Sequence, residues 1–229
     1  MKNLLLMSMT AILLLSCSAD QDYNSEIEST SAPQTNEKAI YALNTLNPFE
    51  ETGINFFNDF DFYVSKNGYP TSNEQLINQI LFLIDKRVNN KQSGKSIITI
   101  TPELILLILA NPEEKLVEII DNSDLSIAVK VNLNSFIADL ISKQQDDYDE
   151  VYDHIVTYES AIVVDSLLEE DEKDTILKVS SISRYSLYAE ARKRDPDWQT
   201  SVTNRPSGEF LKKNQMTFIN LAVLLNVLK

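Results

Sequence analysis

The chain has 229 residues, with 34 Asp and Glu against 20 Lys and Arg, and it contains one Cys and one His. This length suits a single domain with a real hydrophobic core. The net charge of −14 repels nucleic acid and anionic headgroups, so we expect no nucleic-acid partner. One His excludes a zinc site made of several imidazoles in one chain, and four scattered glycines form no phosphate-binding loop. We therefore predict no metal and no cofactor.

The first 16 residues have the pattern of a secretion signal. A cation, Lys2, precedes an apolar run from Leu4 to Leu15, and a small residue, Ser16, stands directly before Cys17. The run is shorter than the roughly 20 apolar residues that a membrane-spanning helix needs. The alternatives are an ordinary signal peptide with a chance Cys near its end, or an uncleaved membrane anchor.

The four residues Leu14-Leu15-Ser16-Cys17 resemble the lipobox of bacterial lipoproteins. The resemblance implies that residues 1–16 are removed and that Cys17 is the lipidation site, carrying acyl chains such as palmitate. Two or more acyl chains hold a protein stably on a membrane surface. We therefore expect a protein anchored to the membrane through Cys17 without crossing it, in the outer membrane of the cell envelope. Lipidation would also leave no free thiol for a disulfide or a Cys nucleophile.

Residues 17–36 contain several acids, no base and almost no apolar side chain. Such a segment buries too little surface to offset the entropy of ordering it, so it predicts a disordered acidic tether. Asp20 and Asp22 resemble the surface-export signals of lipoproteins in Bacteroidota, which implies display on the outer face of the cell. Ser18 is compatible with the outer membrane, because the inner-membrane retention signal of enterobacterial lipoproteins has Asp at that place. A merely solvated spacer is the alternative.

Residues 37–229 predict one all-α domain, a helical bundle of about seven or eight helices. The few glycines and the placement of the prolines outside helix interiors suit helices with abrupt ends. The first expected helix follows Asn47-Pro48 and ends near Asn67-Gly68, and its aromatic side chains, Phe62 included, should pack into the core. A capping box from Thr71 to Glu74 opens the second helix.

Two start signals that contain proline follow in the chain. Thr101-Pro102-Glu103 precedes the run Leu104 to Ala110, which is apolar all round and therefore predicts a short helix buried in the centre. Asn111-Pro112 repeats the start signal and predicts a helical hairpin. The preceding residues, Ser96 to Ile100, have strand character, and we expect them to be extended.

The second half of the domain predicts four more helices. One covers Leu125 to Lys143, and the next follows an acidic turn at 146–153 and carries apolar residues as far as Leu167. A third follows the acidic turn 169–174 and ends in Arg192-Lys193-Arg194, cations that we interpret as favouring the carboxyl end of the helix dipole and not as a binding site. The segment from Ser207 to Lys229 is too interrupted to span a bilayer, so we expect it to close the bundle, with docking on a partner as the alternative.

Candidate groups for chemistry are few. No G-x-S-x-G accompanies His154, so we interpret it as a half-buried helix residue. The acids of the 146–153 turn lack the spacing of an EF-hand, which favours a solvated turn over a calcium site. Paired carboxylates remain a route to glycoside hydrolysis. Tyr185, Tyr188 and Trp198 could line a sugar or peptide cleft, but aromatic residues at helical spacing favour the core.

Two stretches, NPFEETGINFFNDFDFYV from Asn47 and SISRYSLYAEARKRDPDW from Ser181, are similar to segments of uncharacterised secreted proteins of Bacteroidota, which imply no activity. We assign no catalytic residue. The prediction is a non-catalytic binding or interaction module at the cell envelope, with a protein or glycan ligand. A surface hydrolase that works through carboxylates and a structural envelope component are the two alternatives.

Overall fold

A computed structural model of the protein describes residues 41–89, 101–194 and 215–227, and side chains within these ranges up to 86, 193 and 222. All of them belong to one compact unit, Thr35–Lys229. The predicted signal peptide 1–16, the lipidation site Cys17 and the tether 17–36 lie outside the described residues. The same is true of the segment 96–100 and of Trp198.

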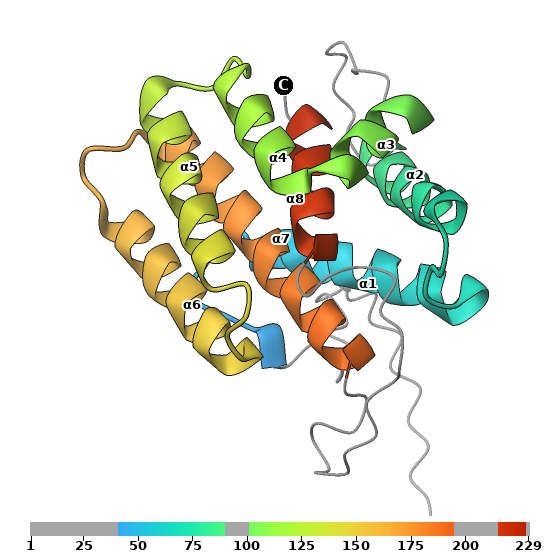
Figure 1. The fold of residues 1–229 in the computed structure, drawn as a ribbon. Coiled ribbons are helices and arrows are strands. Elements are labelled where there is room, and N and C mark those ends of the chain that lie inside the picture. Colours follow the sequence, from blue (N-terminus) through green and yellow to red (C-terminus); the bar gives the residue numbers. More distant parts are fainter. Residues whose placement is uncertain (1–40, 90–100, 195–214, 228–229) are drawn as a thin grey trace, which may run out of the picture. The chain divides into compact units, whose positions relative to one another are not determined.

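Within the described residues the regular elements are eight α-helices and no strands, which confirms the predicted all-α class (Figure 1). The helices are α1 Glu50–Asn67, α2 Asn73–Asn89, α3 Pro102–Ala110, α4 Pro112–Asp121, α5 Ile127–Ser142, α6 Tyr148–Val164, α7 Glu170–Arg194 and α8 Gln215–Val227. None of these helices combines the length and the apolar character needed to cross a membrane.

The longest helix, α7, lies in the core of the bundle. It packs against α1, α5, α6 and α8, and every residue from 179 to 190 is buried. A helix that is buried all round is normally apolar, but this one carries four buried serines, Arg184 and Glu190. Because serine is small, neighbouring helices can approach the α7 backbone closely.

The helices α1 and α7 approach each other closely at Gly53. A Cβ atom at this position would lie 2.3 Å from Cδ2 of Tyr185 and 2.8 Å from the carbonyl oxygen of Ser181. The backbone N–H of Gly53 donates a hydrogen bond to Oγ of Ser181 at 3.2 Å. Position 53 therefore requires glycine because any side chain would push the two helices apart.

The C-terminal helix α8 is the second buried helix. Residues 216–222 are all buried, and α8 packs against α4, α7, α2 and α3. Glu190 of α7 accepts hydrogen bonds from the backbone N–H of Thr217 at 2.5 Å and from its Oγ1 at 3.1 Å, and Nδ2 of Asn220 donates to Oγ of Ser186 at 2.9 Å. The prediction that this segment closes the bundle is confirmed for 215–222, so these side chains are occupied within the chain and not available to a partner. Residues 207–214 lie outside the described part.

Several predicted helix ends are confirmed. Oγ1 of Thr101 accepts the backbone N–H of Leu104 at 3.3 Å and caps α3. The α4 helix starts at Pro112, as the Asn111-Pro112 signal predicts. The α1 helix ends at Asn67 and is followed by Gly68, whose φ of 75° favours glycine.

The capping box predicted at Thr71 and Glu74 is wrong by one residue. The α2 helix begins at Asn73, so Ser72 is the capping residue, and its Oγ accepts the backbone N–H of Gln75 at 3.3 Å. Oε1 of Gln75 in turn accepts the backbone N–H of Thr71 at 2.8 Å. Ser72 therefore caps the helix in place of Thr71, and Gln75 accepts a hydrogen bond from the residue before the cap.

Two predictions of burial and one of helix length are also wrong. The α3 helix is not central: Ile105 and Ile108 are buried, but Leu106 and Leu107 are 45% and 57% exposed because α3 packs through one side only. On α1, Phe62 is exposed and stacks on Phe82 of α2. Leu167 lies past the end of α6 in the connection to α7, where it is exposed while its neighbour Leu168 is buried.

Candidate functional site

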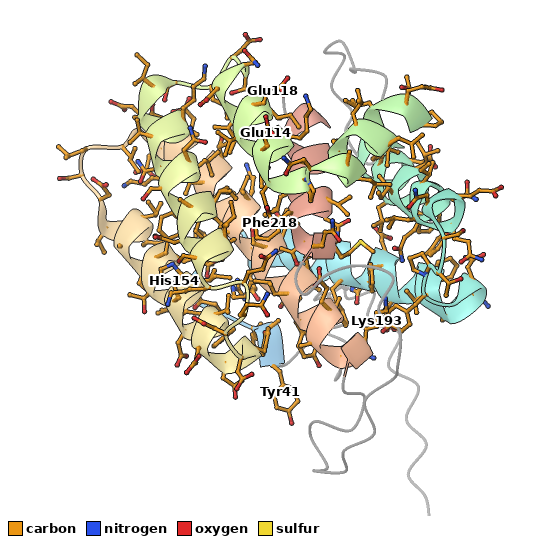
Figure 2. All side chains as sticks on the ribbon, in the orientation of Figure 1. Tyr41, Glu114, Glu118, His154, Lys193 and Phe218 are labelled. Atoms are coloured by element: carbon orange, nitrogen blue, oxygen red, sulfur yellow. The ribbon has the colours of Figure 1, made fainter. Side chains whose placement is uncertain are left out.

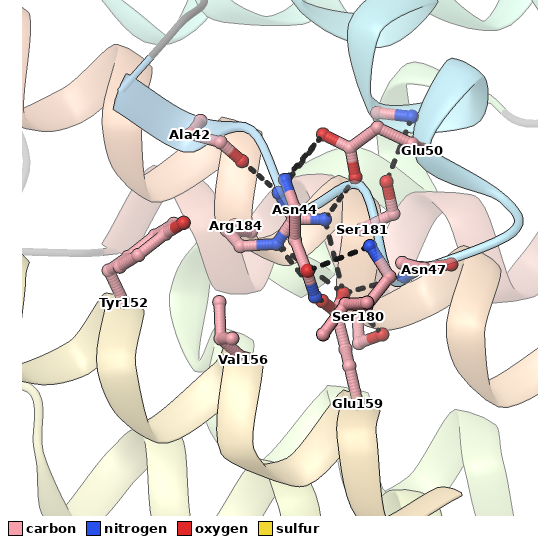
Figure 3. Close-up of polar contacts among 12 residues, drawn as sticks. Ala42, Asn44, Asn47, Glu50, Tyr152, Val156, Glu159, Ser180, Ser181 and Arg184 are labelled. Carbon is pink, nitrogen blue, oxygen red and sulfur yellow. Dashed lines mark hydrogen bonds and ion pairs between the residues drawn. The ribbon is translucent and has the colours of Figure 1, made fainter. Parts of the chain in front are cut away.

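A guanidinium group buried in the bundle, that of Arg184 on α7, gathers polar groups from three parts of the chain (Figure 3). Neither Arg184 nor Glu159 of α6 has exposed surface. The segment before α1 and the first residue of α1 supply the remaining groups. We call this set the Arg184 network; it comprises Ala42, Asn44, Asn47, Glu50, Glu159, Ser180, Arg184 and Tyr185.

Both carboxylate oxygens of Glu159 accept hydrogen bonds. Nδ2 of Asn44 donates to Oε2 at 2.6 Å, and Nδ2 of Asn47 donates to Oε1 at 2.7 Å. Oγ of Ser180 donates to Oε1 at 2.9 Å, and Nε of Arg184 lies 3.2 Å from Oε2. Glu159 is therefore surrounded by donors from α7 and from the segment before α1, as buried carboxylates require.

The second carboxylate of the network, that of Glu50, belongs to the first turn of α1. It accepts from Nη2 of Arg184 at 2.5 Å and from the hydroxyl of Tyr185 at 2.6 Å. The backbone N–H of Asn44 donates to the same carboxylate at 3.1 Å. Its side chain is only 13% exposed, and its place at the amino end of α1 suits the helix dipole.

The network fastens the irregular segment 42–47 to α6 and α7. Nη1 of Arg184 donates to the carbonyl oxygen of Ala42. The hydroxyl of Tyr152 donates to the carbonyl oxygen of Leu43 at 2.7 Å. Nδ2 of Asn47 also donates to the carbonyl oxygen of Leu177 at 3.0 Å. Because this segment has few backbone partners of its own, these side chains satisfy its carbonyl groups.

The surrounding groups keep Arg184 charged and Tyr185 protonated. Burial lowers the pKa of Arg184, but hydrogen bonds to Glu50 and the charges of Glu159 and Glu50 outweigh it, so the net pKa is raised and the guanidinium stays charged. Burial, followed by the hydrogen bond to Glu50, raises the pKa of Tyr185. The hydroxyl of Tyr185 therefore remains a donor at neutral pH.

The geometry of the Arg184 network favours a structural role over catalysis. A general base needs a lone pair within reach of a substrate proton, but the oxygens of Glu159 are buried and engaged with donors from this chain. The network does bring two carboxylates, Glu50 and Glu159, to one guanidinium. In that position they balance a buried charge, which is costly to leave unpaired.

Of the residues weighed for chemistry from the sequence, Tyr185 belongs to the Arg184 network, and the others that the structure describes lie outside it. His154 is on α6 and half-buried, with Nε2 3.7 Å from Oδ2 of Asp139 on α5 (Figure 2). Tyr185 and Tyr188 are buried in the core, and each packs against Phe57 of α1. Asp149 and Glu150 form the acidic first turn of α6. Within the part of the chain that the structure describes, no three His, Cys, Asp or Glu side chains form a group that could hold a metal ion.

The basic end of α7 makes contacts that the capping interpretation did not include. Nη1 of Arg192 lies 3.3 Å from Oδ1 of Asp61 on α1, and its guanidinium lies over the ring of Phe57 at 5.3 Å. Nζ of Lys193 lies 5.5 Å from the ring centre of Tyr69. These two cations therefore also join α7 to the region of α1.

Exposed apolar side chains lie on α5, at the end of α6 and in the connection to α7. Ile127, Val131, Val164 and Leu167 are between 63% and 89% exposed. We call these four residues the α5–α6 apolar face. Isolated exposed apolar residues are common, whereas a group of them marks an interaction surface or an aggregation risk.

Sequence reasoning missed the Arg184 network, although one signal was present. Glu159 follows Val151 and Ile155 and precedes Ile162 at the spacing of the buried side of α6, so a charged residue occupies a core position. A charged residue in a buried stripe predicts a buried partner. Which residue is the partner depends on contacts across more than a hundred positions of sequence, such as Asn44 with Glu159.

The fold and the network define an all-α protein in which the segment before the first helix is clamped to a buried central helix. No known protein family matches the chain, and no curated protein or solved structure is significantly similar to it.

Proposed function

We propose that this protein is a non-catalytic interaction module of the cell envelope, anchored to the outer membrane by lipid on Cys17. The observation that carries the proposal is the α5–α6 apolar face, where four large apolar side chains are exposed. In the interior, the carboxylates of the Arg184 network are engaged by groups of the same chain. A protein whose charged cluster is buried and whose apolar groups are exposed is suited to binding more than to proton transfer.

The proposed membrane location of the module depends on the sequence Leu14-Leu15-Ser16-Cys17. Acyl chains on Cys17 would hold the protein on a membrane, and the acidic segment that follows would keep the bundle at a distance from it. The clamp on residues 42–47 supports this arrangement, because the chain is fastened to the bundle shortly after the proposed tether ends.

Anchoring is tested by cell fractionation of the full chain and of the Cys17→Ser variant. We expect the wild-type protein in the membrane fraction and the variant in the soluble fraction. A Ser29→Ala variant, which changes the tether and keeps Cys17, serves as the matched control and should stay with the membrane. Membrane retention of Cys17→Ser would contradict lipid anchoring.

The absence of catalysis is tested by incubating the membrane-bound protein with glycan and peptide libraries. We expect retention of a ligand without turnover. Turnover that is lost in a Glu50→Gln or Glu159→Gln variant of unchanged helicity would contradict the proposal and favour a carboxylate hydrolase.

A further inference from the structure

The helices α5 and α6 form an antiparallel pair whose register is fixed by three contacts (Figure 1). The ring of Phe136 stacks on that of Tyr158 at 4.6 Å, and the hydroxyl of Tyr158 lies 3.5 Å from the carbonyl oxygen of Asn132. One helical turn or more away, His154 lies beside Asp139. In this register the last residue of α6, Val164, comes level with the first turn of α5, which carries Ile127.

A single carboxylate joins the start of α5 to the connection between α6 and α7. Oγ of Ser126 donates to Oε1 of Glu172, and the backbone N–H of Glu169 donates to Oε2 of the same residue at 3.0 Å. Ser126 directly precedes Ile127, and Glu169 comes two residues after Leu167. The four residues of the α5–α6 apolar face are therefore gathered at one end of the helix pair.

The rim of this face is acidic. Exposed or half-buried acids stand next to it in the chain at Asp124, Asp165, Glu169 and Asp171, in addition to Glu172. The neighbouring cations are already engaged: Nζ of Lys173 lies 3.1 Å from Glu170, and Nζ of Lys130 donates to the carbonyl oxygen of Asp121 at 2.9 Å.

An apolar centre with an acidic rim selects its partner by charge. A second copy of this chain would bring another acidic rim, and an anionic lipid surface would also bring negative charge, so both are repelled. A partner with apolar side chains at its centre and Lys or Arg at its edges complements the face in both respects. An amphipathic helix offers these two features at the spacing of one or two helical turns.

We propose that the α5–α6 apolar face binds a basic amphipathic helix of another protein, with its apolar stripe on Ile127, Val131, Val164 and Leu167 and its cations on the surrounding carboxylates. The inference rests on the proposed function and specifies the class of partner for that interaction module.

The test uses the full lipidated chain in phosphatidylcholine nanodiscs and the fluorescence anisotropy of a labelled Leu/Lys peptide of about 18 residues, long enough for several helical turns. Empty nanodiscs give the background. A scrambled Leu/Lys peptide has the same charge without the apolar stripe, and a Leu/Glu peptide has the stripe with the opposite charge. We expect saturable binding of the Leu/Lys helix only, weakened as salt rises from about 0.1 M to about 0.5 M.

Substitutions on the α5–α6 apolar face test whether the Leu/Lys peptide binds there. Val131→Ser with Leu167→Ser should weaken binding of the Leu/Lys helix by about tenfold or more. The matched control, Leu106→Ser with Leu107→Ser, removes two exposed leucines from α3 and should leave the affinity unchanged. Equal loss in both double variants, unchanged affinity in the first, or equal binding of the scrambled peptide would overturn the proposal.

Two further outcomes separate this inference from the proposed function. Binding of the Leu/Glu peptide in place of the Leu/Lys peptide, with the same dependence on Val131 and Leu167, would overturn the basic partner and leave the interaction module standing. A label on a Ser135→Cys variant that is quenched by brominated lipid of the disc would show that the face lies on the membrane, which would also overturn the proposal. Failure of the module itself would appear instead as turnover in the library assay.

Discussion

The Arg184 network and the α5–α6 apolar face reverse the usual placement of side chains. The network puts a guanidinium and two carboxylates inside the bundle, where each is satisfied by groups of the same chain. The face leaves four large apolar side chains in water, where nothing in the described chain covers them. The first arrangement contributes to folding and is sensitive to any lost partner, while the second contributes little to folding and is free to bind.

The largest effect that separates the two regions should come from removing one partner of the buried charges. The substitution Arg184→Met leaves Glu50 and Glu159 without their cation and should lower the free energy of unfolding by about 3–5 kcal/mol. The double variant Arg184→Met with Glu159→Gln removes the stranded buried charge, keeps an oxygen that can accept from Asn44 or Asn47, and should recover part of this loss. Urea denaturation followed by circular dichroism measures both, and a double variant less stable than Arg184→Met by a further 2 kcal/mol or so would contradict the account.

A second, smaller effect concerns the close crossing of α1 and α7. A Cβ on Gly53 would meet the backbone oxygen of Ser181 at 2.8 Å, which a side-chain rotation cannot relieve. The substitution Gly53→Ala should therefore lower the free energy of unfolding by about 1–3 kcal/mol. Glu51→Ala, two residues away and exposed, is the matched control with little expected change. Thermal unfolding at one protein concentration compares them, and a Gly53→Ala variant as stable as the control would show that the helices can separate freely.

A third prediction concerns pH, because the core tyrosines report on burial. Burial raises the pKa of Tyr185 and of Tyr148 above the ordinary value of 10.0. A group whose pKa is raised in the folded state contributes stability below its unfolded pKa and loses it as pH rises through the folded value. Stability should therefore fall as pH rises above about 10, where the unfolded tyrosines begin to ionise.

Urea midpoints measured in steps from pH 8 to pH 11 check this dependence, and Tyr185→Phe should make the decline shallower because one titrating group is gone. The variant also loses the hydrogen bond to Glu50, so its slope and not its absolute stability is compared. A decline equally steep in the variant would mean that Tyr185 does not contribute to the pH dependence.

The smallest effect on stability should come from the surface. Val131→Ser and Leu167→Ser change side chains that are exposed, so each should alter the free energy of unfolding by no more than about 0.5 kcal/mol. Urea denaturation of the two variants provides the measurement. A loss of several times that size would mean that the α5–α6 apolar face is part of the core, and the contrast between the two regions would disappear.

Local signals in the sequence predicted local structure well. Thr101 with Pro102 marks the start of α3, Asn111 with Pro112 marks the start of α4, and Gly68 marks the end of α1, because a cap depends only on neighbouring residues. The spacing of apolar residues predicted the helix α7 but not its burial on all sides. The same reasoning failed for α3, since a helix that is apolar all round does not reveal which side meets the core.

The Arg184 network could not be predicted from local signals. Its members come from residues 42–50, 159 and 180–185, and their proximity depends on how α1, α6 and α7 pack. The error at Leu167 has a related cause. The predicted helix reached Leu167, whereas α6 ends at Val164, and beyond that end Leu168 and not Leu167 enters the core. Which residues become buried or meet across helices depends on tertiary packing, and the spacing of residues along one helix does not reveal it.

The central claim is that folding depends on the buried charges and binding depends on the exposed apolar group. It is tested most directly by titrating the Leu/Lys peptide onto the Val131→Ser, Leu167→Ser double variant and onto the wild-type chain under identical conditions. The account predicts affinity about tenfold weaker together with an unchanged urea midpoint. Equal affinity for the two proteins would contradict it.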